Sequence, residues 1–154
     1  MTYYFLDSSA LIKRYISETG TNWLRSIVTP IAANTIIVSE ITSVEIVSGV
    51  SRRKRSGQIA FRTAQVIRIL MDRHVSRDYM VIGLGKNIVQ LAENLLEVHP
   101  LRAYDSVQLA SAIESNARLT AAGLPSLIFL SSDQQLLAAA LAEGLAVDDP
   151  NLHP

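Results

Sequence analysis

Residues 3–11 read Tyr3-Tyr4-Phe5-Leu6-Asp7-Ser8-Ser9-Ala10-Leu11, a short apolar run followed by an acid and two serines. The aromatic run predicts a buried strand, and Ser8 or Ser9 can cap a helix that begins near Ala10. In an open parallel sheet the carboxyl ends of the strands form one rim, and acids at strand ends can converge there. Asp7 therefore marks a candidate functional rim.

Strand and helix patterns alternate along the rest of the chain. Further strands are expected at the apolar runs 36–38, 79–82, 127–130 and 146–147. Helices are expected from Ala10 until Gly20 breaks the pattern, and then over 23–28, 40–55, 59–74, 88–95, 106–119 and 134–143. The helices at 40–55 and 59–74 form a hairpin. This alternation predicts the α/β class, as a three-layer α/β/α sandwich with a mostly parallel central sheet.

Length and composition indicate one folded unit. A chain of 154 residues is long enough for a sizeable core, because chains of about 150 residues bury roughly 70% of the surface they expose when unfolded. We expect a single domain over residues 1–150 and a short C-terminal tail at 151–154. Hydrophobic residues make up 49% of the chain and the mean hydropathy is +0.24, which excludes an intrinsically disordered chain.

Charge and cysteine content narrow the function classes. Fourteen basic and fourteen acidic residues cancel, so a nucleic-acid or membrane partner would have to contact a local patch. The absence of cysteine excludes disulfides, thiolate metal sites and cysteine nucleophiles. No signal-peptide pattern and no run of about 20 apolar residues is present, so we expect a soluble, cytoplasmic protein without a membrane partner.

Four acids recur where predicted strands give way to helices. Asp7 ends the first strand, Glu45 lies early in the helix after the second, Asp105 opens a helix, and Asp133 follows the strand at 127–130. Convergent carboxylates repel one another unless a cation lies among them. Oxygen ligands without thiolates suit Mg²⁺ or Mn²⁺. The sequence predicts that these four acids form a divalent-metal site.

Each acid also has a simpler explanation. Asp7, Asp105 and Asp133 could cap helices or interact with helix dipoles. Glu45 could be an exposed helix residue, and the nearby Glu40 could be a rival ligand or a capping residue. Only the combination of the four favours a metal site.

Other polar residues near the same rim leave the ligand set open. Asp148 and Asp149 compete with Asp133 for the place of the fourth ligand, and their alternative is an exposed turn before Pro150. The three histidines show no metal-ligand spacing with one another, which favours surface or packing roles for His74, His99 and His153.

Other α/β proteins also place an aspartate after the first strand. A haloacid-dehalogenase-like phosphatase requires a second aspartate two residues later, where this chain has Ser9. An adhesive metal-binding domain of the Asp-x-Ser-x-Ser type requires serine at the position of Leu11. Both departures count against these two classes.

The combination of motifs resembles the PIN-domain family of metal-dependent ribonucleases, and particularly the VapC-type toxins of toxin–antitoxin pairs. The matching segments are Asp7-Ser8-Ser9-Ala10-Leu11-Ile12-Lys13-Arg14-Tyr15, Ser43-Val44-Glu45-Ile46, Leu101-Arg102-Ala103-Tyr104-Asp105-Ser106-Val107-Gln108-Leu109-Ala110-Ser111-Ala112 and Leu130-Ser131-Ser132-Asp133-Gln134-Gln135-Leu136. Together they extend over nearly the whole chain, and the third is the most specific.

This resemblance implies a PIN-like fold, a Mg²⁺ or Mn²⁺ site, endonucleolytic cleavage of structured RNA, a cognate VapB-type antitoxin and a homodimer. Transferred position by position, Asp7, Glu45 and Asp105 would be ligands, Asp133 would complete the site directly or through water, and Ser9 would support Asp7 by a hydrogen bond. The alternative is a catalytically silent PIN-like domain that binds RNA or protein.

Basic residues supply candidate phosphate contacts. The densest run, Arg52-Arg53-Lys54-Arg55, lies at the predicted tip of the helical hairpin and could contact RNA phosphates. Its alternative is a solvated helix end, where cations are favoured by the helix dipole. Arg102 lies next to Asp105 and is a second candidate, and Lys13 and Arg14 could face the same rim.

Overall fold

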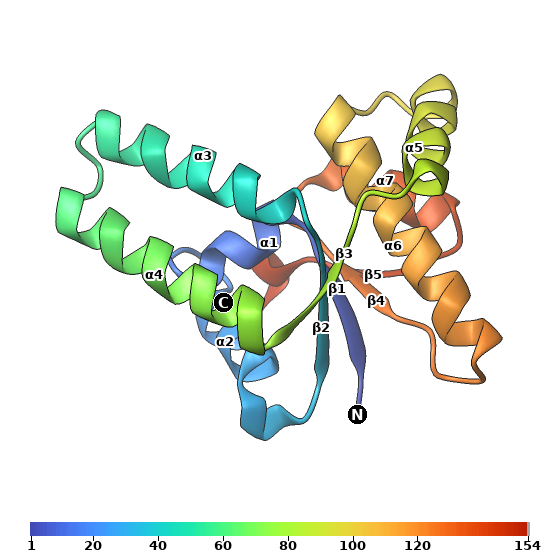
Figure 1. Ribbon diagram of the computed structural model, residues 1–154, viewed down its shortest axis with the longest axis horizontal. Helices are drawn as coiled ribbons and strands as arrows, with labels where there is room; N and C mark the ends of the chain where they lie inside the picture. The colour runs from blue at the N-terminus through green and yellow to red at the C-terminus, as the bar shows by residue number, and fades with distance from the viewer. Residues whose placement is uncertain (154) are drawn as a thin grey trace.

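The central layer is a five-stranded parallel sheet in the order β3-β2-β1-β4-β5 (Figure 1). The structure, a computed structural model, describes residues 1–153. Its strands are β1 (Tyr3–Leu6), β2 (Thr35–Ser39), β3 (Tyr79–Ile82), β4 (Ile128–Leu130) and β5 (Ala146–Asp148). All four neighbouring pairs run parallel, so the carboxyl ends of all five strands point the same way.

Helices cover both faces of this sheet, as Figure 1 shows. The α-helices are α1 (Ser8–Leu11), α2 (Thr21–Val28), α3 (Thr42–Arg55), α4 (Phe61–Arg77), α5 (Lys86–Val98), α6 (Ala103–Ala121) and α7 (Gln134–Ala142), and short 3₁₀ helices follow at η1 (Ile12–Arg14), η2 (Pro30–Ala32) and η3 (Pro150–Leu152). Helices α1 to α4 lie on one face and α5 to α7 on the other. The predicted three-layer α/β/α sandwich is confirmed.

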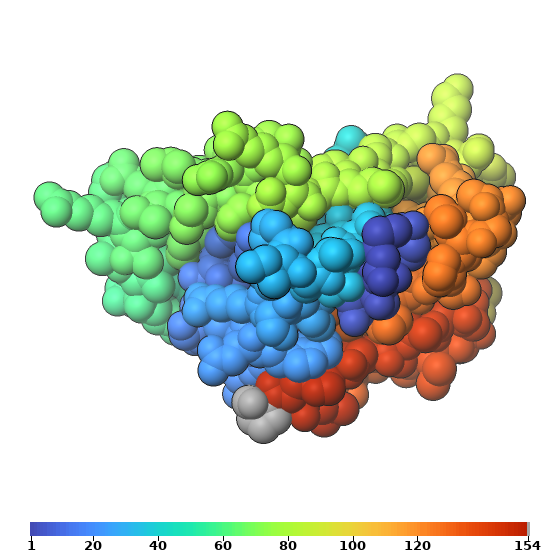
Figure 2. All heavy atoms as spheres, turned by 90° about the horizontal axis from the view of Figure 1, so that it is seen from below, coloured from blue at the N-terminus to red at the C-terminus, as the bar shows by residue number. Residues whose placement is uncertain are grey.

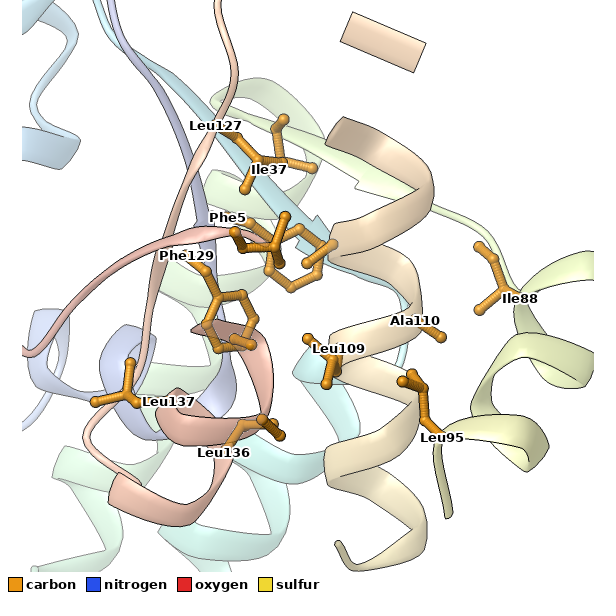
Figure 3. Packing of buried hydrophobic residues seen from close by; sticks show 14 of the residues in the cluster. Phe5, Ile37, Ile88, Leu95, Leu109, Ala110, Leu127, Phe129, Leu136 and Leu137 are labelled. Atoms are coloured by element: carbon orange, nitrogen blue, oxygen red, sulfur yellow. The ribbon is translucent and has the colours of Figure 1, made fainter. Parts of the chain in front are cut away.

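Alternation along the strands divides the core into two parts. Phe5 of β1 points toward α6 and α7, whereas the adjacent Leu6 packs with α1 to α4, as the twofold period of a strand requires. Phe5 stacks on Phe129 of β4 with ring centroids 5.7 Å apart. Figure 3 shows both rings facing Leu109 of α6. Burial of each such side chain contributes roughly 1.5–3 kcal/mol to the free energy of unfolding.

The first helix is much shorter than its pattern predicts. It ends at Leu11, becomes 3₁₀ over η1, and leaves the helical conformation well before Gly20, so the expectation that Gly20 breaks it was wrong. Gly20 instead precedes α2 with φ of +83°, and a Cβ there would lie 2.0 Å from the Pro150 carbonyl oxygen. This glycine is required by a close approach of the C-terminal segment.

The helical hairpin is present, with shifted boundaries. Helix α3 begins at Thr42 rather than near Glu40, because the Glu40 N–H still bonds to the Ile82 carbonyl oxygen of β3 at 2.9 Å. Helix α4 begins at Phe61, two residues after the expected start, because Gly57 adopts φ of +77° in the connecting turn.

Residues 150–153 pack against the N-terminal half of the chain. Figure 2 shows the last residues before the chain end lying directly against the segment that contains α2. His153 stacks on Trp23 of α2 with ring centroids 3.9 Å apart, and Asn151 accepts a hydrogen bond from Lys13 Nζ at 2.9 Å. Residues 151–153 therefore belong to the packed structure.

The helices of the described residues were compared with the length and apolar character that a membrane span requires. Across residues 1–153, every helix is too short or too polar to cross a bilayer.

Candidate functional site

Asp7 is buried at the carboxyl end of the central strand. Its side chain is 3% exposed and caps α1 by accepting from Ala10 N at 2.8 Å. Ser9 Oγ lies 2.8 and 2.9 Å from the two carboxylate oxygens, and Ser131 Oγ donates to Oδ2 at 2.9 Å. The expected contact between Ser9 and Asp7 is thus present, together with one from Ser131 that sequence reasoning missed.

Glu45 lies in the first turn of α3, half-buried on the side that faces α6. Gln108 of α6 donates to its Oε2 at 2.5 Å, and the same amide donates to Thr42 Oγ1 at 3.0 Å. Gln108 and Thr42 are each only 1% exposed, so this polar link between the two helices is shielded from water. Gln108 therefore fixes the position of the Glu45 carboxylate relative to α6.

Asp105 is the third residue of α6 and not its N-cap, which is Arg102. The residues lie one turn apart. Burial raises the pKa of Asp105, and the backbone N–H and the positive charge of Arg102 partly offset this rise. Gln108 follows Asp105 by three residues, so both side chains project from neighbouring positions on one face of α6. Helix α6 thus places a carboxylate and the amide that holds Glu45 side by side.

Asp133 follows β4 and caps α7. Its Oδ1 accepts from Gln135 N at 2.9 Å and Leu136 N at 3.1 Å. Its own N–H donates to Ser131 Oγ at 3.0 Å, and that hydroxyl also contacts Asp7. The capping explanation therefore holds for Asp7 and Asp133, and the two caps share Ser131.

The four acids are close enough for each carboxylate to repel the next, in the order Asp7, Glu45, Asp105 and Asp133. Burial raises the pKa of Asp7 to about 7, and the charge of Glu45 adds to the rise. Burial also raises the pKa of Glu45, with a contribution from Asp105, and raises that of Asp105, with a contribution from Asp133. Since each carboxylate affects the next, the folding brings all four predicted acids to one region.

The chemistry of this group fits a hard divalent cation. As the side chains lie, no three acidic or histidine groups within residues 1–153 stand close enough together to hold one ion. Yet the group offers only oxygen donors, and burial with like charge disfavours the ionised states of Asp7, Glu45 and Asp105. A cation among these carboxylates would reverse that penalty, and Mg²⁺ and Mn²⁺ take such ligands.

The alternative candidates for the metal site, Asp148, Asp149 and Glu40, lie outside the group of four acids. Asp149 is 5% exposed, caps η3 through Asn151 N at 2.8 Å and accepts from Gln134 Nε2 at 2.6 Å, so the alternative of an exposed turn does not hold for Asp149. Asp148 contacts His153 Nε2 at 3.0 Å. Glu40 is exposed. Each of these acids has a structural role or a solvent-facing position apart from the coupled group.

The basic residues separate into different environments. Arg14 does not face the rim, because its guanidinium bonds to Tyr79 Oη at 2.5 Å and lies 3.7 Å from Asp78. Lys13 is buried and contacts Glu18 Oε2 at 3.4 Å. Glu18 also accepts from Arg53 at 2.6 Å.

The predicted basic run is therefore not uniform. Arg52 and Arg53 line a cleft beside Glu45, whereas Lys54 lies over the Phe61 ring at 5.5 Å and Arg55 is exposed. The two halves of the run face different surroundings because successive residues project from different sides of α3.

The histidines have packing roles, as predicted. His74 contacts Tyr15 Oη, His99 contacts Glu143 and His153 stacks on Trp23.

Sequence reasoning missed the residues that hold the acids in place. Ser131, Gln108 and Thr42 are polar yet buried. Two signals could have identified two of them: Ser131 lies two residues before Asp133, and Gln108 lies one helical turn after Asp105. Glu18 gave no such signal, because its partners Lys13 and Arg53 are brought to it only by folding.

Comparison with known proteins identifies the type of domain. Residues 4–140 match the family model of the PIN domain. A search of curated proteins by sequence found no match.

Solved structures with the same fold are distant in sequence. FitAcB from Neisseria gonorrhoeae is 15% identical, with 98% of this chain and 99% of that chain covered and a TM-score of 0.67. VapC20 from Mycobacterium tuberculosis, a sarcin–ricin loop cleaving toxin, is 14% identical over 93% and 96% of the two chains, with a TM-score of 0.62. A toxin–antitoxin complex from Klebsiella pneumoniae is 17% identical over 95% and 96%, with a TM-score of 0.56. These likenesses establish a shared fold.

Proposed function

The chain belongs to the PIN domain family, and on that premise we propose that it is a Mg²⁺- or Mn²⁺-dependent endoribonuclease, the toxin of a VapBC-type toxin–antitoxin pair. The observation that supports this most is the coupling of Asp7, Glu45, Asp105 and Asp133 at the carboxyl end of a parallel sheet. Ligand sites of open α/β sheets lie at that end.

In this proposal the four carboxylates hold the metal and do not attack phosphorus. When bound, a divalent ion would lower the pKa of a water molecule and neutralise charge that develops on a phosphate. Asp7 and Glu45 would be the most firmly placed ligands, because hydroxyl and amide groups already orient them. Asp133 has only its Oδ1 engaged by the cap, which leaves Oδ2 for a direct or water-mediated contact.

Several residues of the chain would serve the reaction without binding metal. Ser9 and Ser131 hold the Asp7 carboxylate, and Gln108 holds that of Glu45. Arg102 is exposed beside Asp105, where it can contact an RNA phosphate. Of the basic run, Arg52 and Arg53 face the cleft beside Glu45 and are the better candidates for phosphate contacts than Lys54 and Arg55.

The proposed partners are an RNA substrate, a VapB-type antitoxin and a second copy of the chain, in the cytoplasm. The support for the antitoxin is the fold shared with VapC20 and with the toxin–antitoxin complex of Klebsiella pneumoniae. A toxic nuclease needs such an inhibitor in the cell. The purified protein must therefore be free of antitoxin before its activity is measured.

The experiment that tests this function is cleavage of total cellular RNA by the purified chain, freed of antitoxin, with Mg²⁺, with Mn²⁺ and with chelator. Asp7→Asn serves as the site variant, and Asp72→Asn is a matched control because Asp72 is an exposed residue of α4 paired with Arg68. Discrete fragments that require metal and are lost only in Asp7→Asn are expected. A folded, metal-loaded protein that cuts no RNA would contradict the proposal and favour a silent binding domain.

A further inference from the structure

A cleft opens beside Glu45, and Asp105 is not among the residues that line it. Its lining includes Ser8, Ser9, Lys13, Glu18, Arg53 and Ser132, with Glu45 at its edge. The lining comes from α1, from η1, from the loop before α2, from α3 and from the β4–α7 junction. Of the four acids proposed to hold metal, Glu45 alone is among the residues that line this cleft.

Glu18 bridges two cations inside this cleft. Its Oε1 accepts from Arg53 Nη2 at 2.6 Å and its Oε2 lies 3.4 Å from Lys13 Nζ. Lys13 is 4% exposed, and its other hydrogen bond goes to a neutral amide, that of Asn151, at 2.9 Å. Two positive charges therefore share one carboxylate, and one positive charge remains in excess. A buried cation is stable only when an anion accompanies it.

The packing of α3 against η1 brings these charges together. At Gly49 a Cβ would lie 3.2 Å from Ile12 Cδ1 and 3.5 Å from Arg53 Nη1. The lack of a side chain at Gly49 allows Ile12 of η1 to lie close to α3. The cations are thus placed by the fold of the cleft, and not by Glu18 alone.

Ser132 adds a donor without a partner. Among the described residues its Oγ is the one buried side-chain polar atom that makes no hydrogen bond, and Ser132 lines the same cleft. Leaving such a buried hydroxyl unpaired destabilises the protein. A ligand with several acceptor oxygens would satisfy it.

We propose that Lys13, Arg53 and Ser132 form a binding subsite for a backbone phosphate of the RNA, and that the Glu18 carboxylate occupies this subsite when RNA is absent. A phosphodiester and a carboxylate both present two oxygens to an arginine fork and carry one negative charge, so one can replace the other. An RNA strand is favoured over an acidic peptide because Glu45, at the cleft edge, belongs to the proposed cleavage site. This inference rests on the proposed function and names a contact beyond the position that is cut.

The test is RNA binding in chelator, where no cleavage occurs. Glu18→Gln keeps the size and acceptor oxygen of the side chain but removes its charge, and we expect it to bind a single-stranded RNA about 3- to 10-fold more tightly than wild type. Arg53→Gln is expected to weaken binding and to lower the slope of log K against log salt by about 0.7, the value for one phosphate contact on a single strand. Arg55→Gln is the matched control, because Arg55 is an exposed residue of the same helix that does not line the cleft.

Combining the variants separates competition at Arg53 from a general charge effect. The gain in RNA affinity from Glu18→Gln is expected to persist when it is combined with Arg55→Gln and to disappear when it is combined with Arg53→Gln. An equal gain in both backgrounds, or weaker binding by a folded Glu18→Gln protein, would overturn the proposal. If Glu18→Gln lowers thermal stability too far for the assay, Glu18→Asp, whose shorter side chain reaches the cations less well, is expected to tighten binding to a smaller extent.

A second probe keeps this outcome distinct from failure of the proposed function. Titration with inorganic phosphate, followed by NMR signals of the Arg53 side chain and the Ser132 amide, is expected to saturate at lower concentration in Glu18→Gln than in wild type. If the phosphate titration saturates but the wild-type protein binds no RNA, the nuclease function is contradicted and the anion-binding site is retained. Absence of any saturable shift in Glu18→Gln would overturn the subsite, as would tighter binding of a glutamate peptide than of the RNA.

Discussion

Ser131 Oγ, at the end of β4, donates a hydrogen bond at 2.9 Å to the carboxylate of Asp7, at the end of the neighbouring strand β1. The same hydroxyl accepts from the N–H of Asp133 at 3.0 Å. One buried side chain thereby fixes the relative positions of two acids that are 126 residues apart in the sequence.

Ser131→Ala removes both bonds. The Asp133 N–H then lacks its partner and Asp7 loses a donor, so we expect a loss of about 1–3 kcal/mol in the free energy of unfolding. Because the Ser131 bond lowers the pKa of Asp7, that pKa should also rise above about 7. Denaturant unfolding and carboxyl NMR measure the two effects. Ser126→Ala, at an exposed position before β4, is the control, and equal stability of the two variants would contradict the assigned role.

The stability of the metal-free protein should fall as pH rises from about 4 to about 7. The folded pKa of Asp7 is about 7, above its ordinary value of 3.8, so in this range the folded chain retains a proton that the unfolded chain has released. At about 1.4 kcal/mol per pKa unit the loss from Asp7 amounts to roughly 4 kcal/mol.

Asp7→Asn should remove this part of the pH dependence. Unfolding by denaturant at pH 4.5 and pH 7.5 in chelator, for wild type and Asp7→Asn, measures it. The same pH dependence of stability in wild type and in Asp7→Asn would show that Asp7 ionises normally. Addition of Mn²⁺ at pH 7.5 is expected to raise the stability of the wild-type protein again.

Glu45→Gln should reduce metal affinity and RNA cleavage together. The variant can still contact Gln108, so the fold is expected to persist, but it lacks the charge that would bind a cation. A loss of at least tenfold in Mn²⁺ affinity, measured by calorimetry, should accompany a similar or larger loss of cleavage rate. Glu93→Gln, on the exposed side of α5, is the control. Unchanged cleavage by Glu45→Gln would remove Glu45 from the site.

Arg102→Gln should raise the pKa of Asp105. The Arg102 charge lowers that pKa while burial and the Asp133 charge raise it, so removal of the cation leaves only the backbone N–H of residue 102 to oppose the rise. The carboxyl signal of Asp105 should titrate at higher pH in NMR, and RNA should bind less tightly. Arg118→Gln, near the other end of α6 and paired with Glu114, should change neither property. A pKa that stays at its wild-type value would contradict the coupling.

Much of this architecture could be predicted because its signals are local. The aromatic run before Asp7, the apolar run before Asp133 and the helical spacing between them identify the strands and helices, and parallel order then brings the strand ends to one rim. The predicted helix boundaries were wrong where contacts with residues far away in the sequence determine them. Glu40 stays outside α3 because its N–H bonds to the Ile82 carbonyl oxygen, and Gly20 is needed because Pro150 packs on it.

The environment of the acids could not be predicted in the same way. Whether a carboxylate is a solvated cap or a buried, coupled group depends on partners from other elements, such as Ser131 beside Asp7 or Gln108 beside Glu45. The same holds for Lys13, whose position next to Arg14 suggested one surface for both. In the folded chain Lys13 contacts Glu18 while Arg14 contacts Tyr79 on the other side of η1.

We propose that Asp7, Glu45, Asp105 and Asp133 bind one divalent-metal centre. The measurement that tests it most directly is a crystal structure of the protein with Mn²⁺, in which anomalous scattering locates the ion. We expect a Mn²⁺ peak among these four carboxylates, with oxygen ligands about 2.2 Å away. A Mn²⁺-containing crystal with no peak at this rim, or with the ion bound by Asp148 and Asp149 instead, would contradict the account.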